Sequence, residues 1–366
     1  MGILKNENGI TDGNSVVTAH TDDKASAQWV NVTDVCVNVV SVSGQAPLLY
    51  ANGLNMIAVR VYMTSQDINE KTIDDIDVNE LVGAVTLIDY DTGVPFTKID
   101  HPPSLNHITP GGTYCTVANK YLSGSNFINP GISGYGKRYI TLYFAYNGTS
   151  STSVRIGCKI KPTYPDKGAD GRYVYNEVVN SINGDTHCPT TPIKVTVKKF
   201  KDSDVTESHL YSANVSTGKS PNRDIFRYYI KFSDGVITHV DLPTSSQPGA
   251  PTGYFHYKQT GNYKDFCCFT DDKFDVDPSA KWTTPTFKID NSWSDSVTFY
   301  NHEEDGVCIF LYRFWYGALW SYQEWNLGAI FTLYDEYGNA CKISAIRDEP
   351  NDKIKFSVVN HHHHHH

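Results

Sequence analysis

One short segment of the chain carries carboxylates at a spacing that could hold a metal ion. The sequence DDKFDVDP places Asp271, Asp272, Asp275 and Asp277 close together. Oxygen ligands from aspartate are those that Ca²⁺ prefers in proteins. We therefore consider Ca²⁺ binding at these four aspartates, on the edge of a sheet, although a solvated acidic loop would show the same pattern.

Motifs of known catalytic and cofactor sites are missing from the sequence. The segment DIDVNE begins like an EF-hand loop, but Glu80 stands where that loop requires glycine. No HExxH, CxxC, GxSxG, P-loop or GxGxxG pattern occurs. We therefore expect a non-enzymatic protein with no catalytic residues and no cofactor other than the possible Ca²⁺.

A second candidate site is aromatic. The stretch Tyr312–Trp325 holds seven aromatic residues in fourteen, and its first part alternates like a central strand. The later aromatic residues lie in a connection between two expected strands. There they could pack against the rest of the chain, form a subunit contact, or offer a platform to a sugar or a membrane surface. The predicted ligand-binding residues are Trp315, Trp320, Tyr322 and Trp325.

The scaffold that positions these residues is expected to consist of strands. Runs such as MIAVRVYM, YITLYFAYNG and AIFTLYDEYGN are rich in β-branched and aromatic residues, and turn residues follow them. Helical periodicity is confined to EKTIDDIDVNELVGA, residues 70–84, which we expect to be a loop or one short helix. The pattern predicts an all-β protein with two tandem antiparallel β-sandwich domains, immunoglobulin-like or jelly-roll-like, and barrels are the alternative.

Four pairs of similar segments recur in the same order and indicate an internal duplication. They are LYAN and LYSAN, FTKIDHP and ITHVDLP, YITLYFAYNG and CIFLYRFWYG, and IGCKI and LGAIF. The resulting organisation is an N-terminal arm at 1–27, a first sandwich at 28–162, a linker at 163–185, a second sandwich at 186–350 with an insertion near 254–295, a C-terminal tail at 351–360, and a histidine tag at 361–366.

Charge and cysteine usage narrow the partners and the location. The chain has 31 basic and 40 acidic residues, a net charge of -9, and we therefore expect no nucleic-acid partner. No apolar stretch is long enough for a transmembrane helix, although contact with a membrane surface remains possible. The N-terminal residues show no signal-peptide pattern, so we expect a cytoplasmic protein that is later released, or secretion by a non-classical route. The eight cysteines favour buried free thiols, with disulfides as the alternative.

Three functions fit these observations. The first is a surface-recognition protein that binds a glycan or a host receptor through loops of its domains. The second is a bacterial toxin or virulence factor, for example an insecticidal one, that acts at a host cell surface. The third is a self-assembling structural or inclusion protein, in which aromatic residues would lie between copies of a homo-oligomer.

Overall fold

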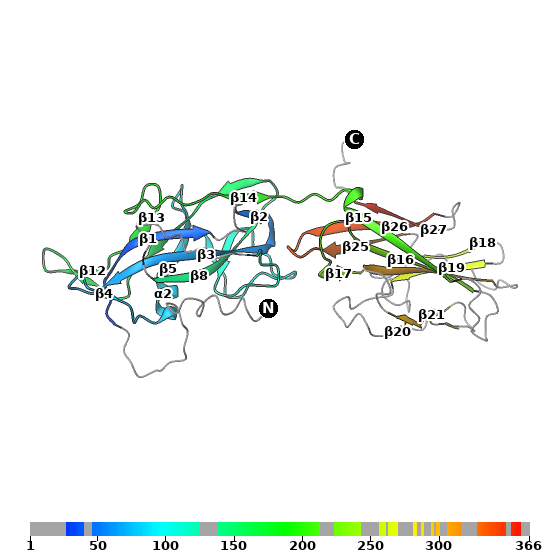
Figure 1. The fold of residues 1–366 in the computed structure, drawn as a ribbon, viewed down its shortest axis with the longest axis horizontal. Helices are drawn as coiled ribbons and strands as arrows, with labels where there is room; N and C mark the ends of the chain where they lie inside the picture. The colour runs from blue at the N-terminus through cyan, green and yellow to red at the C-terminus, as the bar shows by residue number, and fades with distance from the viewer. Residues whose placement is uncertain are drawn as a thin grey trace. The chain divides into compact units, whose positions relative to one another are not determined.

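The computed structural model describes residues 27–39, 46–124, 136, 138–212, 223–242, 256–260, 263–269, 281–283, 287–288, 294–295, 298–300, 306–315, 328–348 and 353–359. These residues divide between two compact units, Met1–Lys198 and Lys199–His366. Most of the described elements are β-strands, and they form several sheets (Figure 1). The predicted all-β class is confirmed.

The first unit contains one large, mostly antiparallel sheet. Its strand order is β1-β3-β8-β7-β6, and β4 pairs with the end of β3. Among the described strands of this sheet, the β6–β7 pair alone is parallel. The strands are β1 (Asn31–Val39), β3 (Asn52–Gln66), β4 (Thr72–Ile73), β6 (Thr97–Lys98), β7 (Gly111–Cys115) and β8 (Arg138–Asn147).

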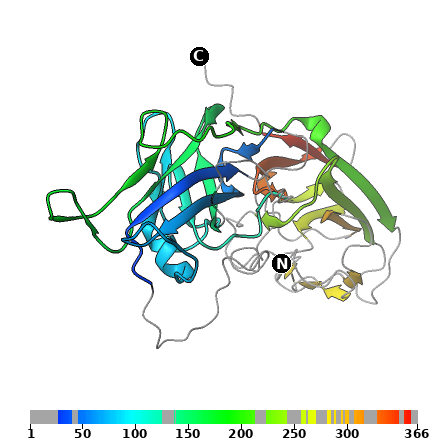
Figure 2. The ribbon, with the colours of Figure 1, turned by 60° about the vertical axis from the view of Figure 1, so that its left-hand side comes forward.

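The remaining strands of the first unit form two small sheets and a hairpin. One sheet has the order β13-β10-β5, and the other has the order β2-β14-β9. Their strands are β5 (Val85–Asp89), β10 (Ile156–Ile160), β13 (Val178–Asn180), β2 (Leu48–Tyr50), β9 (Thr152–Val154) and β14 (Ile193–Thr196). The hairpin of β11 (Asp166–Lys167) and β12 (Tyr173–Val174) projects from this unit (Figures 1 and 2).

The core of the first unit lies where the large sheet meets the β5 and β10 strands. Alternate residues of β3, from Ile57 to Met63, belong to one buried cluster, as a period of two requires for one face of a strand. The same cluster contains Phe144 of β8, Leu87 of β5 and Ile156 of β10. Its members therefore come from more than one sheet. The other residues of β3 in this stretch, Ala58, Arg60 and Tyr62, are also buried, so the strand is buried on both faces.

The second unit has a five-stranded and a four-stranded sheet, both antiparallel. Their strand orders are β15-β16-β24-β19-β18 and β17-β25-β26-β27. The strands are β15 (Val205–Ser212), β16 (Arg223–Phe232), β24 (Val307–Trp315), β19 (Tyr263–Phe269), β18 (His256–Thr260), β17 (His239–Asp241), β25 (Gly328–Tyr334), β26 (Ala340–Asp348) and β27 (Lys353–Val358). Two further pairs are β20 (Lys281–Thr283) with β23 (Thr298–Tyr300) and β21 (Phe287–Lys288) with β22 (Ser294–Asp295). A buried cluster joins the two larger sheets through Ile230, Leu311, Phe331 and Ile343.

At the β27 edge of the four-stranded sheet, side chains of the same unit accept hydrogen bonds from two backbone amides. β27 is its last strand. The backbone amide of Ile354 donates to the hydroxyl of Tyr228, at 3.4 Å, and that of Val358 donates to Oδ1 of Asp202, at 2.8 Å. Tyr228 belongs to β16, and Asp202 begins the 3₁₀ helix η1 (Asp202–Asp204). Two donors that β27 could offer to another strand are therefore already used.

Of the four pairs of similar segments, only some lie on corresponding strands of the two units. YITLYFAYNG and CIFLYRFWYG lie on β8 and β24, each inside the large sheet of its unit, and IGCKI and LGAIF fall on β10 and β25. FTKIDHP, in contrast, contains β6, which pairs with β7, whereas ITHVDLP contains β17, which pairs with β25. LYAN and LYSAN likewise overlap β2 and β15, which occupy different sheets. The duplication therefore stays a prediction.

The segments predicted to be a linker, a tail and an insertion all contain β-strands. Residues 163–185, expected as a linker, contain β11, β12 and β13, and β13 pairs with β10 in the first unit. The tail at 351–360 contains β27, which pairs with β26. The insertion near 254–295 contains β18 and β19, which extend the sheet beyond β24. Residues 1–26 of the N-terminal arm and the tag at 361–366 lie outside the described residues.

The expectation of free thiols is wrong for one pair of cysteines. Cys36 of β1 forms a disulfide with Cys188, and the two Cα atoms are 5.3 Å apart. The amide of Cys188 donates to Oδ1 of Asn180 at 3.2 Å, which holds the segment before β14 in place. The expectation is confirmed for four cysteines, which are buried and not disulfide-bonded: Cys115, Cys158, Cys308 and Cys341.

Candidate functional site

The predicted ligand-binding and Ca²⁺-binding residues lie where the structure does not describe side chains. Trp320, Tyr322 and Trp325 lie outside the described residues, as do the four aspartates Asp271, Asp272, Asp275 and Asp277. Trp315 is the last residue of β24, and only its backbone is described there. The aromatic ligand platform and the Ca²⁺ site therefore both stay predictions.

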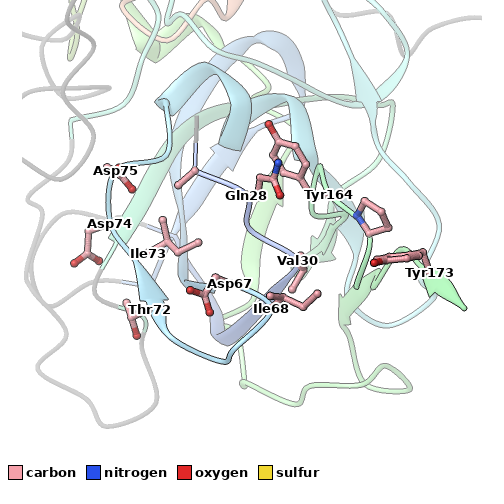
Figure 3. Close-up of a pocket in the computed structure, with 12 residues that line it drawn as sticks. Gln28, Val30, Asp67, Ile68, Thr72, Ile73, Asp74, Asp75, Tyr164 and Tyr173 are labelled. Atoms are coloured by element: carbon pink, nitrogen blue, oxygen red, sulfur yellow. The ribbon is translucent and has the colours of Figure 1, made fainter. Parts of the chain in front are cut away.

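A cleft in the first unit has a volume of about 730 Å³ (Figure 3). That volume lies within the range of roughly 300–1,000 Å³ that is typical of ligand pockets. The lining residues come from four separate segments of the chain. They are Ala27, Gln28, Val30, Asp67, Ile68, Thr72, Ile73, Asp74, Asp75, Tyr164, Pro165 and Tyr173.

The entry into β1 forms one wall of the cleft, and Trp29 fixes it. Gln28 and Val30 line the cleft, whereas the side chain of Trp29 between them is fully buried in the core. Nε1 of Trp29 donates to Oε1 of Glu80 at 3.1 Å. Glu80 lies in the first turn of α2 (Val78–Ala84), the one α-helix of the described chain. This hydrogen bond ties the start of β1 to α2. The helix α2 follows residues 67–75, which form another wall of the cleft.

A tight turn after β3 presents an exposed isoleucine. Oδ1 of Asp67 accepts hydrogen bonds from the amides of Asn69 and Lys71, at 2.8 and 2.9 Å. Such side-chain bonds stabilise a turn without help from the rest of the fold. Glu70 completes the turn with φ of 64°, a left-handed conformation. As a result, Ile68 stands at the cleft with half of its surface exposed.

An acidic segment continues from this turn to α2. Residues 67–80 contain six acidic residues and one lysine. Asp77 caps the helix, since its Oδ1 accepts from the amide of Asn79 at 2.7 Å. Asp74 and Asp75 are exposed and line the cleft, on the side away from Tyr173 (Figure 3). The observed helix agrees with the short-helix alternative for residues 70–84.

One arginine lies beside these carboxylates. Nη1 of Arg138 donates to the backbone oxygen of Asp74 at 3.0 Å. Burial lowers the pKa of the Arg138 guanidinium, and the charges of Asp74, Asp77 and Asp75 act in the opposite direction. Arg138 thus offsets part of the negative charge of the loop, but it is not among the residues that line the cleft.

The hairpin of β11 and β12 supplies the far wall. Nδ2 of Asn176 donates to Oδ2 of Asp166 at 3.0 Å and to the backbone oxygen of Val30 at 3.2 Å. These two bonds tie the hairpin to the start of β1. The side chain of Tyr173 is 65% exposed at the cleft, and Val174 and Tyr175 beside it are exposed as well. Three consecutive exposed apolar or aromatic residues on a projecting hairpin are a typical feature of contact surfaces.

The lining of this cleft offers hydrogen-bond acceptors next to apolar surface. Its lining includes three carboxylates and one amide, together with hydroxyls and apolar side chains, but neither His, Cys, Lys nor Arg. Within the described part of the chain, no group of three or more His, Cys, Asp or Glu side chains is placed to hold a metal ion. The same residues include no helix long and apolar enough to cross a membrane.

A second polar cluster lies on the four-stranded sheet of the second unit. Nε2 of His239 is 2.8 Å from Oδ1 of Asp241, and the hydroxyl of Tyr334 donates to Oδ2 of the same aspartate at 3.0 Å. These residues are neighbours across β17 and β25. They do not line the cleft of the first unit, and we interpret them as a cross-strand polar contact.

The free thiols should be inert in the folded protein. Burial raises the pKa of Cys115 to about 11 and that of Cys158 to about 12, and burial with nearby aspartates raises the pKa of Cys341 to about 12. The thiolate is the form that reacts with alkylating agents. At pH 8 we therefore expect no alkylation of these three cysteines by iodoacetamide in the native protein and complete alkylation in denaturant, as measured by peptide mass spectrometry. Rapid labelling of native Cys158 would contradict this assignment.

Sequence reasoning did not find the cleft, although two signals pointed toward it. The acidic residues in 67–80 indicate, by themselves, no more than an incomplete EF-hand loop and a short helix. The Tyr-Val-Tyr run at 173–175 lay inside an expected linker. Neither signal shows that the two segments lie on opposite sides of one cavity, because that depends on the path of β1 and β3 between them.

No protein-family model and no curated protein matches this chain.

Proposed function

We propose that this protein is a non-enzymatic recognition protein and that the cleft of the first unit binds part of a glycan or of a receptor. The observation that supports the proposal most directly is the combination of exposed Tyr173 and Ile68 with carboxylates at one solvent-open cavity. Exposed apolar groups next to fixed polar groups are what a binding site requires. Rigid support comes from the hydrogen bonds of Trp29 and Asn176, which fix two walls.

The fold that we propose for this function is a pair of β-sandwich units related by duplication. The supporting observation is that each core cluster draws its residues from two sheets of one unit. Sandwich scaffolds commonly carry binding sites on the loops and strand ends, because the sheets hold these segments in fixed positions. The cleft is built from such segments.

The proposal is tested by binding of the full chain to an array of immobilised glycans and peptides. The double variant Tyr173→Ala/Ile68→Ala removes two exposed groups of the cleft. The control Val236→Ala/Ile330→Ala removes two apolar side chains of similar exposure from the second unit, outside the lining. We expect saturable binding that the first variant weakens about tenfold or more and the control leaves unchanged, since about 1.4 kcal/mol corresponds to tenfold.

Two results would contradict the proposal. One is equal binding by the cleft variant and the control, which would place the recognition surface elsewhere, for example at Trp320 and Trp325. The other is no saturable binding to any member of the array. Thermal denaturation of both variants shows whether they remain folded, and we expect little change because all four replaced side chains are largely exposed.

A further inference from the structure

We propose that the ligand of the cleft is a polypeptide segment in which a lysine or arginine stands next to an aliphatic or aromatic residue. This inference rests on the proposed function and goes further by assigning the chemical class of the ligand. It follows from the groups that line the cleft, from the charge around it and from its size.

The first argument is the balance of donors and acceptors. Asp67, Asp74 and Asp75 present carboxylates, which only accept hydrogen bonds when they are ionised. No lining residue carries a cationic donor, and the other polar side chains are those of Gln28, Thr72 and two tyrosines. The cleft therefore favours a ligand that is rich in hydrogen-bond donors. A neutral sugar, which offers donors and acceptors in equal measure, is a poorer match. Ammonium and guanidinium groups are such donors.

The second argument is charge. Residues 67–80 carry six carboxylates against one lysine, and Arg138 is the basic residue held against this loop. Asp74 and Asp75 are exposed, and Asp67, which also lines the cleft, is partly exposed. Opposite charge steers a cationic ligand to the site and penalises an anionic one. The net charge of the whole chain, -9, also attracts cationic ligands and repels anionic ones.

The third argument is the apolar part of the lining. The apolar and aromatic lining residues are Ile68, Ile73, Val30, Tyr164, Pro165 and Tyr173. Ile73 lies near Asp74, Ile68 lies beside Val30, and Tyr173 lies on the opposite side from Asp74 (Figure 3). A side chain bound between them would bury apolar surface on both sides, at roughly 25 cal/mol for each Å² removed from water. The 65% exposure of Tyr173 and the 50% exposure of Ile68 show how much surface is available for this contact. An apolar residue beside a basic one satisfies both parts of the cleft.

The test is selection from a library of capped hexapeptides, with two adjacent positions varied, by the immobilised full chain. We expect enrichment of Lys or Arg next to Ile, Leu, Phe or Tyr. For the best peptide we expect the variant Asp74→Asn/Asp75→Asn to raise Kd about tenfold or more, and added NaCl, from about 50 to 500 mM, to raise it as well. The control Asp100→Asn/Glu207→Gln removes the same charge from residues outside the lining and should leave Kd within about twofold.

The outcomes separate this inference from the function on which it rests. Enrichment of basic–apolar peptides that depends on Asp74 and Asp75 supports both. Selection of acidic or uncharged peptides, or binding of a glycan that the Tyr173→Ala/Ile68→Ala variant weakens, overturns the polypeptide assignment and leaves recognition at the cleft standing. Absence of any saturable, cleft-dependent binding of peptides and glycans overturns both.

Discussion

Removal of the Cys36–Cys188 disulfide, in the variant Cys36→Ser/Cys188→Ser, is expected to lower the free energy of unfolding of the first unit by about 3–4 kcal/mol. The bond joins residues 152 positions apart, so it restricts a very long loop in the unfolded chain. In the folded unit it connects β1 to the segment that leads into β14. Calorimetry should show a melting temperature lower by roughly 10 °C for this unit.

Reduction of the wild-type protein provides the matched control. Dithiothreitol should lower the melting temperature of the wild type to that of the double variant and leave the variant unchanged. Hydrogen exchange should increase in β1 and β14, whereas β25 and β26, which belong to the second unit, serve as the internal reference. A wild type whose melting temperature is the same with and without reductant would show that the bond contributes nothing to stability.

The second large effect is expected at Trp29. Its side chain is fully buried, and it is the largest residue type in the core of the first unit. Trp29→Ala should lower the free energy of unfolding by about 3–5 kcal/mol, because it leaves a cavity and removes the partner of Glu80. Since Gln28 and Val30 flank this residue and line the cleft, the same variant should also weaken ligand binding. Urea unfolding followed by circular dichroism measures the stability change.

Trp29→Phe separates packing from hydrogen bonding. Phenylalanine keeps an aromatic ring in the core but cannot donate to Glu80, so we expect it to cost less than alanine, with about 1 kcal/mol assigned to the lost bond. In a double-mutant cycle, Glu80→Ala should lose most of its effect once Trp29 is replaced. A loss of less than about 1 kcal/mol for Trp29→Ala would contradict the core assignment.

The sequence predicted the strand-rich class because long strands have a pattern that is visible without a structure. MIAVRVYM lies within β3 and YITLYFAYNG largely within β8, and both are buried on two faces. The short strands β11, β12 and β13 have two or three residues each, too few for any period to appear, so their segment looked like a linker. The disulfide was missed because its cysteines are far apart in the chain and one of them lies inside an apolar run.

The cleft was harder to predict than the fold, for a physical reason. Its walls come from residues 27–30, 67–75, 164–165 and 173, and no two of these segments share a periodic pattern. Each segment has an ordinary local explanation: Asp67 stabilises a turn, Asp77 caps a helix and Asn176 bonds to a hairpin. They line one cavity only in the folded unit, where β3 and the β10–β13 pairing set the path of the chain. Trp320, Trp325 and the aspartates at 271–277 remain separate predictions.

Two amides on the edge of β27 are already bonded to side chains, which limits how copies of this protein could join there. A strand from another molecule would have to displace the hydroxyl of Tyr228 and the carboxylate of Asp202 before it could pair with the amides of Ile354 and Val358. Fibrils that grow by continuous sheet extension are therefore disfavoured at this edge, even at high protein concentration. If the chain forms particles or inclusions, we expect contacts between side-chain surfaces at this position, which dilution can reverse more readily than a shared backbone ladder.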